Sequence, residues 1–146
     1  MLVPSKKIFY ALEAVLFVAF NAKSGAVASR DIADRQGLPA RYLEPILQKL
    51  VRGGILKSVR GPQGGYVLGR ERRRITLADI CALLEGEEAL PAASMPLGDD
   101  VLRPVLAEAQ KAWQAQLASI DMATLCEQAT AKGIAPAFEQ LNDFTI

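Results

Sequence analysis

Five polar side chains within residues 40–52 have the chemistry to read nucleotide bases. They are Arg41, Tyr42, Glu44, Gln48 and Lys49. Side chains with forked or paired hydrogen-bonding groups discriminate base edges when the first turns of a helix enter a DNA groove. DNA phosphates repel a carboxylate, so Glu44 is expected on a DNA-facing surface only if it binds a base. The base that offers a carboxylate a hydrogen-bond donor is cytosine, through its amino group. Pairing of Glu44 with Arg41 at a solvated surface is an equally weighted alternative.

A second group with binding chemistry follows in the string RGPQGGY. Its members are Arg60, Gly61, Pro62, Gln63, Gly64, Gly65 and Tyr66. Glycines let the backbone approach a ligand closely, and proline presets a turn. An arginine carried on such a thin tip is suited to a narrow, A·T-rich minor groove. A phosphate-binding loop is the rival interpretation, but the string lacks a Gly-Lys-Ser/Thr ending and no helix start follows it.

These groups must be positioned by a helix-turn-helix followed by a hairpin. A short helix is predicted over residues 29–36, with Ser29 as its N-cap and Gly37 as its stop. Three residues later a helix runs over residues 40–52. Its apolar positions share one face: Leu43, Ile46, Leu47 and Leu50. Short helix, tight turn and second helix are typical of DNA-binding helix-turn-helix units.

Two short β-prone runs, residues 55–59 and 66–68, flank the glycine-rich tip and predict a wing. The fold class is therefore mainly α with a small β-hairpin, a winged helix-turn-helix. Pro45, inside the second helix, removes one backbone hydrogen bond and is expected to kink it, at a cost of about 3 kcal/mol if uncompensated.

The elements around this unit are mostly helical. A helix over residues 5–22 is capped by Ser5, and Lys6 and Lys7 in its first turn oppose the helix dipole, which hints at a nearby phosphate. A further helix starts with a capping box formed by Thr76 and Asp79.

The longest helix is predicted over residues 101–119. Its apolar stripe comprises Leu102, Leu106, Ala109, Trp113, Leu117 and Ile120. We favour a second subunit as the partner of this stripe over the chain's own winged domain. The predicted organisation is a winged helix-turn-helix domain (1–74), a connecting helix and loop (75–98), dimerisation helices (99–131) and a tail (132–146) that docks through Ile134, Phe138, Leu141 and Phe144.

Charge is unevenly distributed along the chain. Residues 1–74 hold 14 of the 17 Lys and Arg residues but only 5 of the 16 acidic residues. A basic half joined to an acidic half indicates a polyanion-binding part. The chain has no His, which excludes Ser-His-Asp and Cys-His catalysis and His-ligated metal sites, so we expect no enzyme.

Cys81 and Cys126 form no disulfide framework and fit a reducing compartment. The apolar run after Lys7 contains Glu13 and lacks a small-residue cleavage site, and it is far shorter than a membrane span. We therefore expect a cytoplasmic protein that does not interact with membranes.

The string SVRGPQGGYVL over residues 58–68, together with Tyr42-Leu43-Glu44 and Ile75-Thr76-Leu77-Ala78-Asp79-Ile80, resembles the Rrf2 family of bacterial transcription regulators. The match extends to about residue 131. The resemblance implies a homodimer joined through the long helix and bound to a pseudo-palindromic DNA operator. It also implies DNA contacts by Tyr42, Glu44, Ser58 and Arg60. We include Lys6 and Ser29 among the candidate contacts. Pro45 stands where relatives often carry a polar DNA-facing residue.

The resemblance breaks down at the sensing site. Relatives with an iron–sulfur cluster place three cysteines before and at the start of the long helix, whereas residues 86–104 contain none. Cys81 and Cys126 fall on apolar helix faces and are interpreted as buried structural thiols rather than ligands or a redox switch. We therefore expect no metal and no cofactor.

The leading hypothesis is a homodimeric, sequence-specific double-stranded DNA-binding regulator, a repressor, without a cluster. One alternative is a cluster-free regulator that acts mainly by docking on a metabolic enzyme. Another is a thiol redox sensor that uses Cys81 and Cys126.

Overall fold

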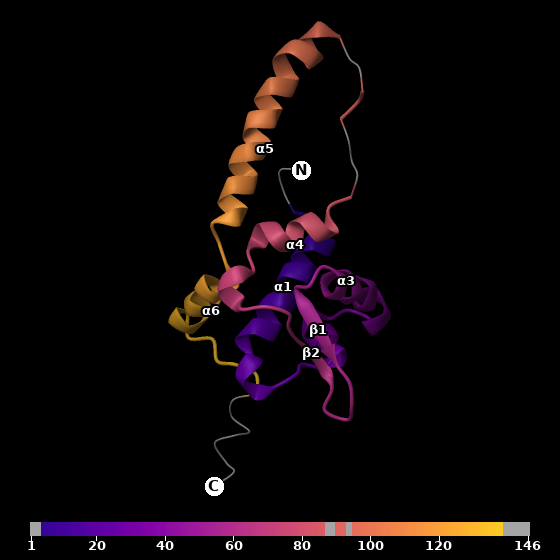
Figure 1. Ribbon diagram of the computed structural model, residues 1–146, viewed down its shortest axis with the longest axis vertical. Coiled ribbons are helices and arrows are strands. Elements are labelled where there is room, and N and C mark those ends of the chain that lie inside the picture. Colours follow the sequence, from indigo (N-terminus) through magenta and orange to yellow (C-terminus); the bar gives the residue numbers. More distant parts are fainter. Residues whose placement is uncertain (1–3, 87–89, 93–94, 139–146) are drawn as a thin grey trace.

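A computed structural model describes residues 4–86, 90–92 and 95–138. It consists of a helical body carrying one two-stranded hairpin, from which a single long helix projects (Figure 1). The elements follow in the order α1 (Lys6–Phe20), η1 (Ala22–Ser24), α2 (Ser29–Gln36), α3 (Ala40–Arg52), β1 (Leu56–Val59), β2 (Gly65–Leu68), η2 (Arg72–Arg74), α4 (Leu77–Leu84), η3 (Leu97–Leu102), α5 (Arg103–Ala118) and α6 (Met122–Ala131). The predicted fold class, mainly α with a small hairpin, is confirmed.

Helix α1 is the centre of the body. The Ser5 hydroxyl accepts a hydrogen bond from the Ile8 N–H and caps the helix, as predicted. Its buried positions are Ile8, Ala11, Ala14, Val15, Val18 and Ala19. This face packs against α3, α4, α6 and β2. Burial of a whole helix face makes α1 the scaffold against which α3 and the hairpin pack.

The helix-turn-helix forms as predicted, with one correction. Helix α3 has the predicted bounds, its four predicted apolar positions are fully buried, and it continues through Pro45. Gly37 ends α2 with a left-handed φ of 67°. The prediction that Ser29 is the N-cap is wrong: Ala28 holds the extended cap position and Ser29 begins the helix. The reason is that Val27 pairs with Tyr66 in a β-bridge, which keeps the backbone extended up to Ala28.

The hairpin pairs β1 with β2 in antiparallel register, Leu56 opposite Leu68 and Val59 opposite Gly65. Each strand differs from the prediction by one residue at its start. The same bridge, with Tyr66 N–H donating to Val27 O at 2.8 Å, docks β2 on the segment before α2. A Cβ on Gly65 would lie 2.3 Å from Val27 O, so only glycine allows this approach.

The predicted capping box of α4 is confirmed. Thr76 Oγ1 accepts from the Asp79 N–H at 3.1 Å, and Asp79 Oδ2 accepts from the Thr76 N–H at 3.0 Å. Thr76 also bridges to Asp121, whose side chain caps α6. These pairings fasten α6 to the start of α4.

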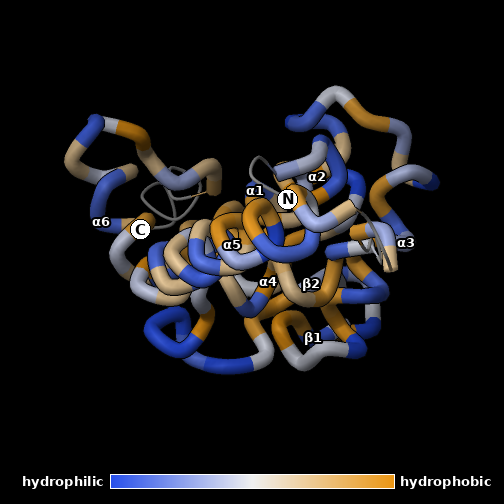
Figure 2. The backbone as a smooth tube through the Cα atoms, turned by 90° about the horizontal axis from the view of Figure 1, so that it is seen from above, coloured by the Kyte–Doolittle hydropathy of each residue, from blue (hydrophilic) through white to orange (hydrophobic). Residues whose placement is uncertain are grey.

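The long helix begins earlier than predicted, with the π-helical segment η3. Its two halves differ in how far they are buried by the rest of the chain. Leu117 is buried and Trp113 packs on the body's core, so the C-terminal half of α5 is held by its own chain. The N-terminal half projects away from the body (Figure 1). Viewed from above, α5 alternates hydrophobic and hydrophilic residues (Figure 2). The amphipathic stripe therefore has two different environments.

The tail returns to α1. Phe138 lies edge-on to Phe17 with ring centroids 6.2 Å apart. Ile134 is exposed, so of the four predicted docking residues Phe138 docks and Ile134 does not. Leu141 and Phe144 fall outside the described residues.

Candidate nucleic-acid interface

The polar residues predicted to read bases lie on the exposed face of α3. Arg41, Tyr42, Glu44 and Gln48 are exposed, while the opposite face is buried in the core. Lys49 is only partly exposed. A helix with one face fixed in a core and the other lined with hydrogen-bonding groups can lie in a major groove without rearranging.

Tyr42 is held in place by an aromatic neighbour. Its ring stands perpendicular to that of Tyr10 on α1, with centroids 6.2 Å apart. Edge-to-face pairs of this geometry are favourable beyond their buried area. Tyr42 nevertheless remains 46 % exposed, so it is oriented but accessible. Tyr10 could not be predicted, because nothing local in the sequence reveals that α1 packs against α3 at this point.

Glu44 lies on the exposed face of α3 and influences the electrostatics of Tyr66 on β2. Burial raises the pKa of the Tyr66 hydroxyl, and the nearby Glu44 carboxylate adds to the effect. No ion pair of Glu44 occurs among the described residues, so its carboxylate has no guanidinium or ammonium partner there. Helix α3 packs against β1, so the helix and the hairpin are adjacent.

The wing tip presents Arg60 on a tight glycine turn. Arg60, Pro62 and Gln63 are all exposed. Gly61 has a φ of 111°, which other residues rarely adopt, and its carbonyl accepts from the Gly64 N–H at 2.9 Å. Ser58 is exposed on β1 opposite Tyr66. The tip is thus a tight, exposed turn at the end of the β1–β2 hairpin.

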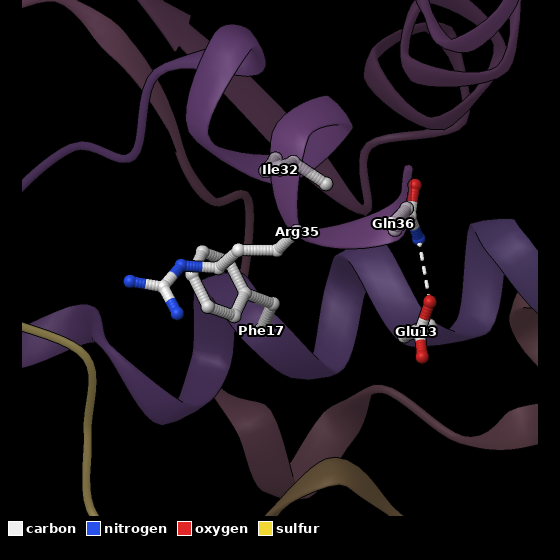
Figure 3. A pocket seen from close by; sticks show the side chains of 5 residues that line it. All are labelled: Glu13, Phe17, Ile32, Arg35 and Gln36. Atoms are coloured by element: carbon white, nitrogen blue, oxygen red, sulfur yellow. Dashed lines mark hydrogen bonds between the residues drawn. The ribbon is translucent and has the colours of Figure 1, made fainter. Parts of the chain in front are cut away.

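Contacts between α1 and α2 fix the helix-turn-helix to the scaffold (Figure 3). The Gln36 amide donates to Tyr10 O and to Glu13 Oε1, both at 3.0 Å. The Arg35 guanidinium lies over the Phe17 ring, 5.4 Å from its centroid. A pocket of about 130 Å³, too small for most small-molecule ligands, is lined by Glu13, Phe17, Ile32, Arg35 and Gln36. The contacts act as mechanical support for α2.

The other candidate contacts lie at helix starts. Lys6 is exposed in the first turn of α1, and Ser29 is the first residue of α2. Helix N-termini present free N–H groups that bind anions, which suits both positions to phosphate contact.

The sequence model of one family, described as Rrf2, iron-dependent transcriptional regulator, matches residues 4–128. The chain belongs to the Rrf2 family. It is 42 % identical over 76 residues to the HTH-type transcriptional regulator IscR of Xenorhabdus nematophila, a match that covers 52 % of this chain and 46 % of the relative. The chain thus spans about half the length of the curated relatives it matches.

Solved structures of the family match over more of the chain. The T. potens IscR structure covers 93 % of this Rrf2 protein and 94 % of its own length, with a TM-score of 0.76 and 34 % identity. The structure of CymR, the global cysteine regulator of B. subtilis, covers 88 % and 98 % with a TM-score of 0.69 and 31 % identity. The winged helix fold of the Rrf2 regulators is therefore shared by this protein.

The family description mentions iron, but the donor groups of this Rrf2 protein do not fit an iron–sulfur cluster. Such clusters are held by cysteine thiolates, in some cases with histidine. Cys81 and Cys126, the only two cysteines, are buried, and the chain has no His. No group of three or more His, Cys, Asp or Glu residues able to hold a metal occurs in the described part of the chain.

Both thiols are also electrostatically disfavoured as ligands or nucleophiles. Burial raises the pKa of Cys81, and Glu85 adds to the effect. Burial likewise raises the pKa of Cys126, against an opposing influence of Arg72. A raised thiol pKa keeps sulfur protonated and unreactive near neutral pH.

Within the described residues, no helix is both long and apolar enough to cross a membrane.

Proposed function

We propose that this Rrf2 protein is a homodimeric, sequence-specific, double-stranded DNA-binding transcriptional regulator that represses from a pseudo-palindromic operator. The observation that carries the proposal is the exposed polar face of α3, which packs against β1 of a hairpin whose tip exposes Arg60. Helix α3 enters the major groove with Tyr42 and Glu44 at base edges. Arg60 enters the adjacent minor groove.

The dimer is formed through the projecting half of the long helix. Leu97, Val101, Leu102, Val105 and Leu106 are each between 41 % and 68 % exposed. A contiguous exposed apolar surface of this kind marks an interaction site. Ala109 is exposed on the same half, whereas Trp113 and Leu117 pack on the protein's own core, and Ile120, beyond the end of α5, is partly exposed. A second copy that covers the first set relates two reading units by two-fold symmetry, which a palindromic operator matches.

Regulation proceeds without an iron–sulfur cluster. The support is the absence of cysteine from residues 86–104 and the burial of both thiols. We propose repression rather than activation because binding to an operator is by itself sufficient for repression. The protein acts in the cytoplasm, where bacterial DNA is located.

The salt dependence of binding tests this function. Affinity for random-sequence duplex DNA should fall steeply with salt, by about 0.9 log unit per log unit of salt for each phosphate neutralised. A protein that works mainly by docking on an enzyme would show no such slope. Binding that is absent or insensitive to salt would contradict the proposal.

A further inference from the structure

A groove of about 690 Å³ lies between the C-terminal end of α1 and the chain that follows α6. One wall comes from residues 19–23, at the end of α1 and in η1, and the other comes from α6 and residues 133–136. After α6 the chain runs back to the end of α1 (Figure 1). The volume falls in the range of small-molecule sites, roughly 300–1,000 Å³.

The wall formed by residues 133–136 is tied to the body at both of its ends. The Ile134 N–H donates to Ala129 O at 3.1 Å, which fixes the segment to the end of α6. The Ala137 N–H donates to the Asn21 side-chain oxygen at 2.7 Å, which fixes it to the end of α1. Helix α6 itself packs against α1. The groove is therefore formed before any ligand binds, as most small-molecule sites are.

Part of the groove surface is apolar and accessible. Phe20 and Pro136 line the groove and are partly exposed, and Ile134 is 55 % exposed. Covering such side chains with an apolar group removes hydrocarbon surface from water, which is favourable. The apolar part of a ligand would gain free energy here.

The charges of the groove favour an anion. Lys23 and Arg72 outnumber the one carboxylate, Glu127, and none of the three takes part in an ion pair within the described part of the chain. Burial raises the pKa of the Cys126 thiol, which also lines the groove, and the Arg72 guanidinium acts against this rise. A guanidinium presents paired N–H donors that match the two oxygens of a carboxylate.

We propose that this groove is a binding site for a small organic carboxylate with an apolar body. Arg72 pairs with the carboxylate, and Lys23 adds to the positive potential that attracts it. The apolar body lies against Phe20, Ile134 and Pro136. No residue that lines this groove belongs to α3, β1 or β2, so the inference does not depend on the proposed DNA binding.

The test is a saturation-transfer NMR titration of the full chain with 2-naphthoate, which combines a carboxylate with an apolar body. The matched probes are 2-naphthamide, which keeps the apolar body without the charge, and acetate, which keeps the charge without the apolar body. The wild type should bind 2-naphthoate about ten-fold more tightly than 2-naphthamide, the effect of one hydrogen bond between charged groups. Acetate should bind more weakly than 2-naphthoate.

Four variants place the site. Arg72→Gln should weaken binding of 2-naphthoate about ten-fold and leave binding of 2-naphthamide unchanged. Lys23→Gln should cause a smaller loss of the same kind. Ala22→Trp, which fills the groove from an exposed position, should weaken binding of both naphthalene compounds. Arg73→Gln is the matched control, because Arg73 is exposed beside Arg72 but does not line the groove, and it should change neither affinity.

Equal affinity of the wild type for 2-naphthoate and 2-naphthamide would overturn the assignment, as would equal losses in Arg72→Gln and Arg73→Gln. A loss of duplex DNA affinity in Arg72→Gln without a loss of 2-naphthoate affinity would also overturn it, because Arg72 would then be a DNA contact. If the wild type bound no duplex but bound 2-naphthoate through Arg72, the proposed function would fail and this site would stand.

Discussion

The Asn21 side-chain oxygen accepts a hydrogen bond of 2.7 Å from the backbone N–H of Ala137, 116 positions further along the chain. Asn21 is only 1 % exposed, and its amide nitrogen donates to Phe17 O at 2.8 Å. The next residue, Phe138, contacts Phe17, and Arg35 of α2 lies over both rings. The segment after α6 is thereby anchored to α1 and α2 together.

Asn21→Ala should destabilise the protein by about 1–3 kcal/mol, because it removes a buried acceptor and leaves the Ala137 N–H unpaired. Urea denaturation measures the free energy of unfolding. Gln114→Ala, on the exposed surface of α5, is the control and should lie within about 0.5 kcal/mol of the wild type. An Asn21 effect as small as that of the control would show that the anchor does not stabilise the fold.

The secondary structure of the helix-turn-helix could be predicted from local sequence signals, whereas contacts between residues distant in sequence could not. The bounds of α3 and the Thr76–Asp79 capping box follow from residues a few positions apart. Ser29 was misassigned because the pairing of Val27 with Tyr66, distant in sequence, decides where the extended backbone ends. Likewise, an apolar stripe on α5 does not reveal what covers it, so Leu117 against the body and Leu102 in the open look alike in sequence.

Arg60→Ala should weaken specific DNA binding, most at operators with a narrow A·T-rich minor groove, because such grooves concentrate negative potential that attracts guanidinium. Titration of A·T-rich and G·C-rich variants of one site measures the effect. Arg30→Ala, an exposed arginine of α2 outside the wing, is the control. Equal affinity of wild type and Arg60→Ala for the A·T-rich site would mean that the wing tip does not enter the groove.

The thiols should resist alkylation in the native protein near pH 8 and react once the chain is unfolded in urea. Their pKa values are raised in the folded state, so folding retains protons that the unfolded chain loses. This contribution to stability is present below the ordinary thiol pKa and is lost as pH rises through the raised folded pKa. Iodoacetamide labelling followed by mass spectrometry measures the reactivity of each thiol in the native and the unfolded protein. Rapid native labelling at Cys126, or a peroxide-driven disulfide, would favour a redox sensor.

The double variant Val105→Glu with Leu106→Glu should convert the dimer to a monomer, because it places charges in the apolar surface of the projecting helix. Analytical ultracentrifugation measures the state. Glu108→Gln with Lys111→Gln, at an exposed ion pair of the same helix, is the matched control and should leave the dimer intact. A dimer that survives the double glutamate change would place the interface elsewhere.

An unbiased selection of bound duplexes, performed with the wild type and with Glu44→Ala, tests the reading unit most directly. The wild type should enrich two half-sites related by approximate two-fold symmetry and centred about one helical turn apart or a multiple of it. Glu44→Ala should still bind but should lose preference at the position where the wild type selects cytosine. Enrichment of no symmetric site, or an unchanged preference in the variant, would contradict DNA reading by α3 and the wing.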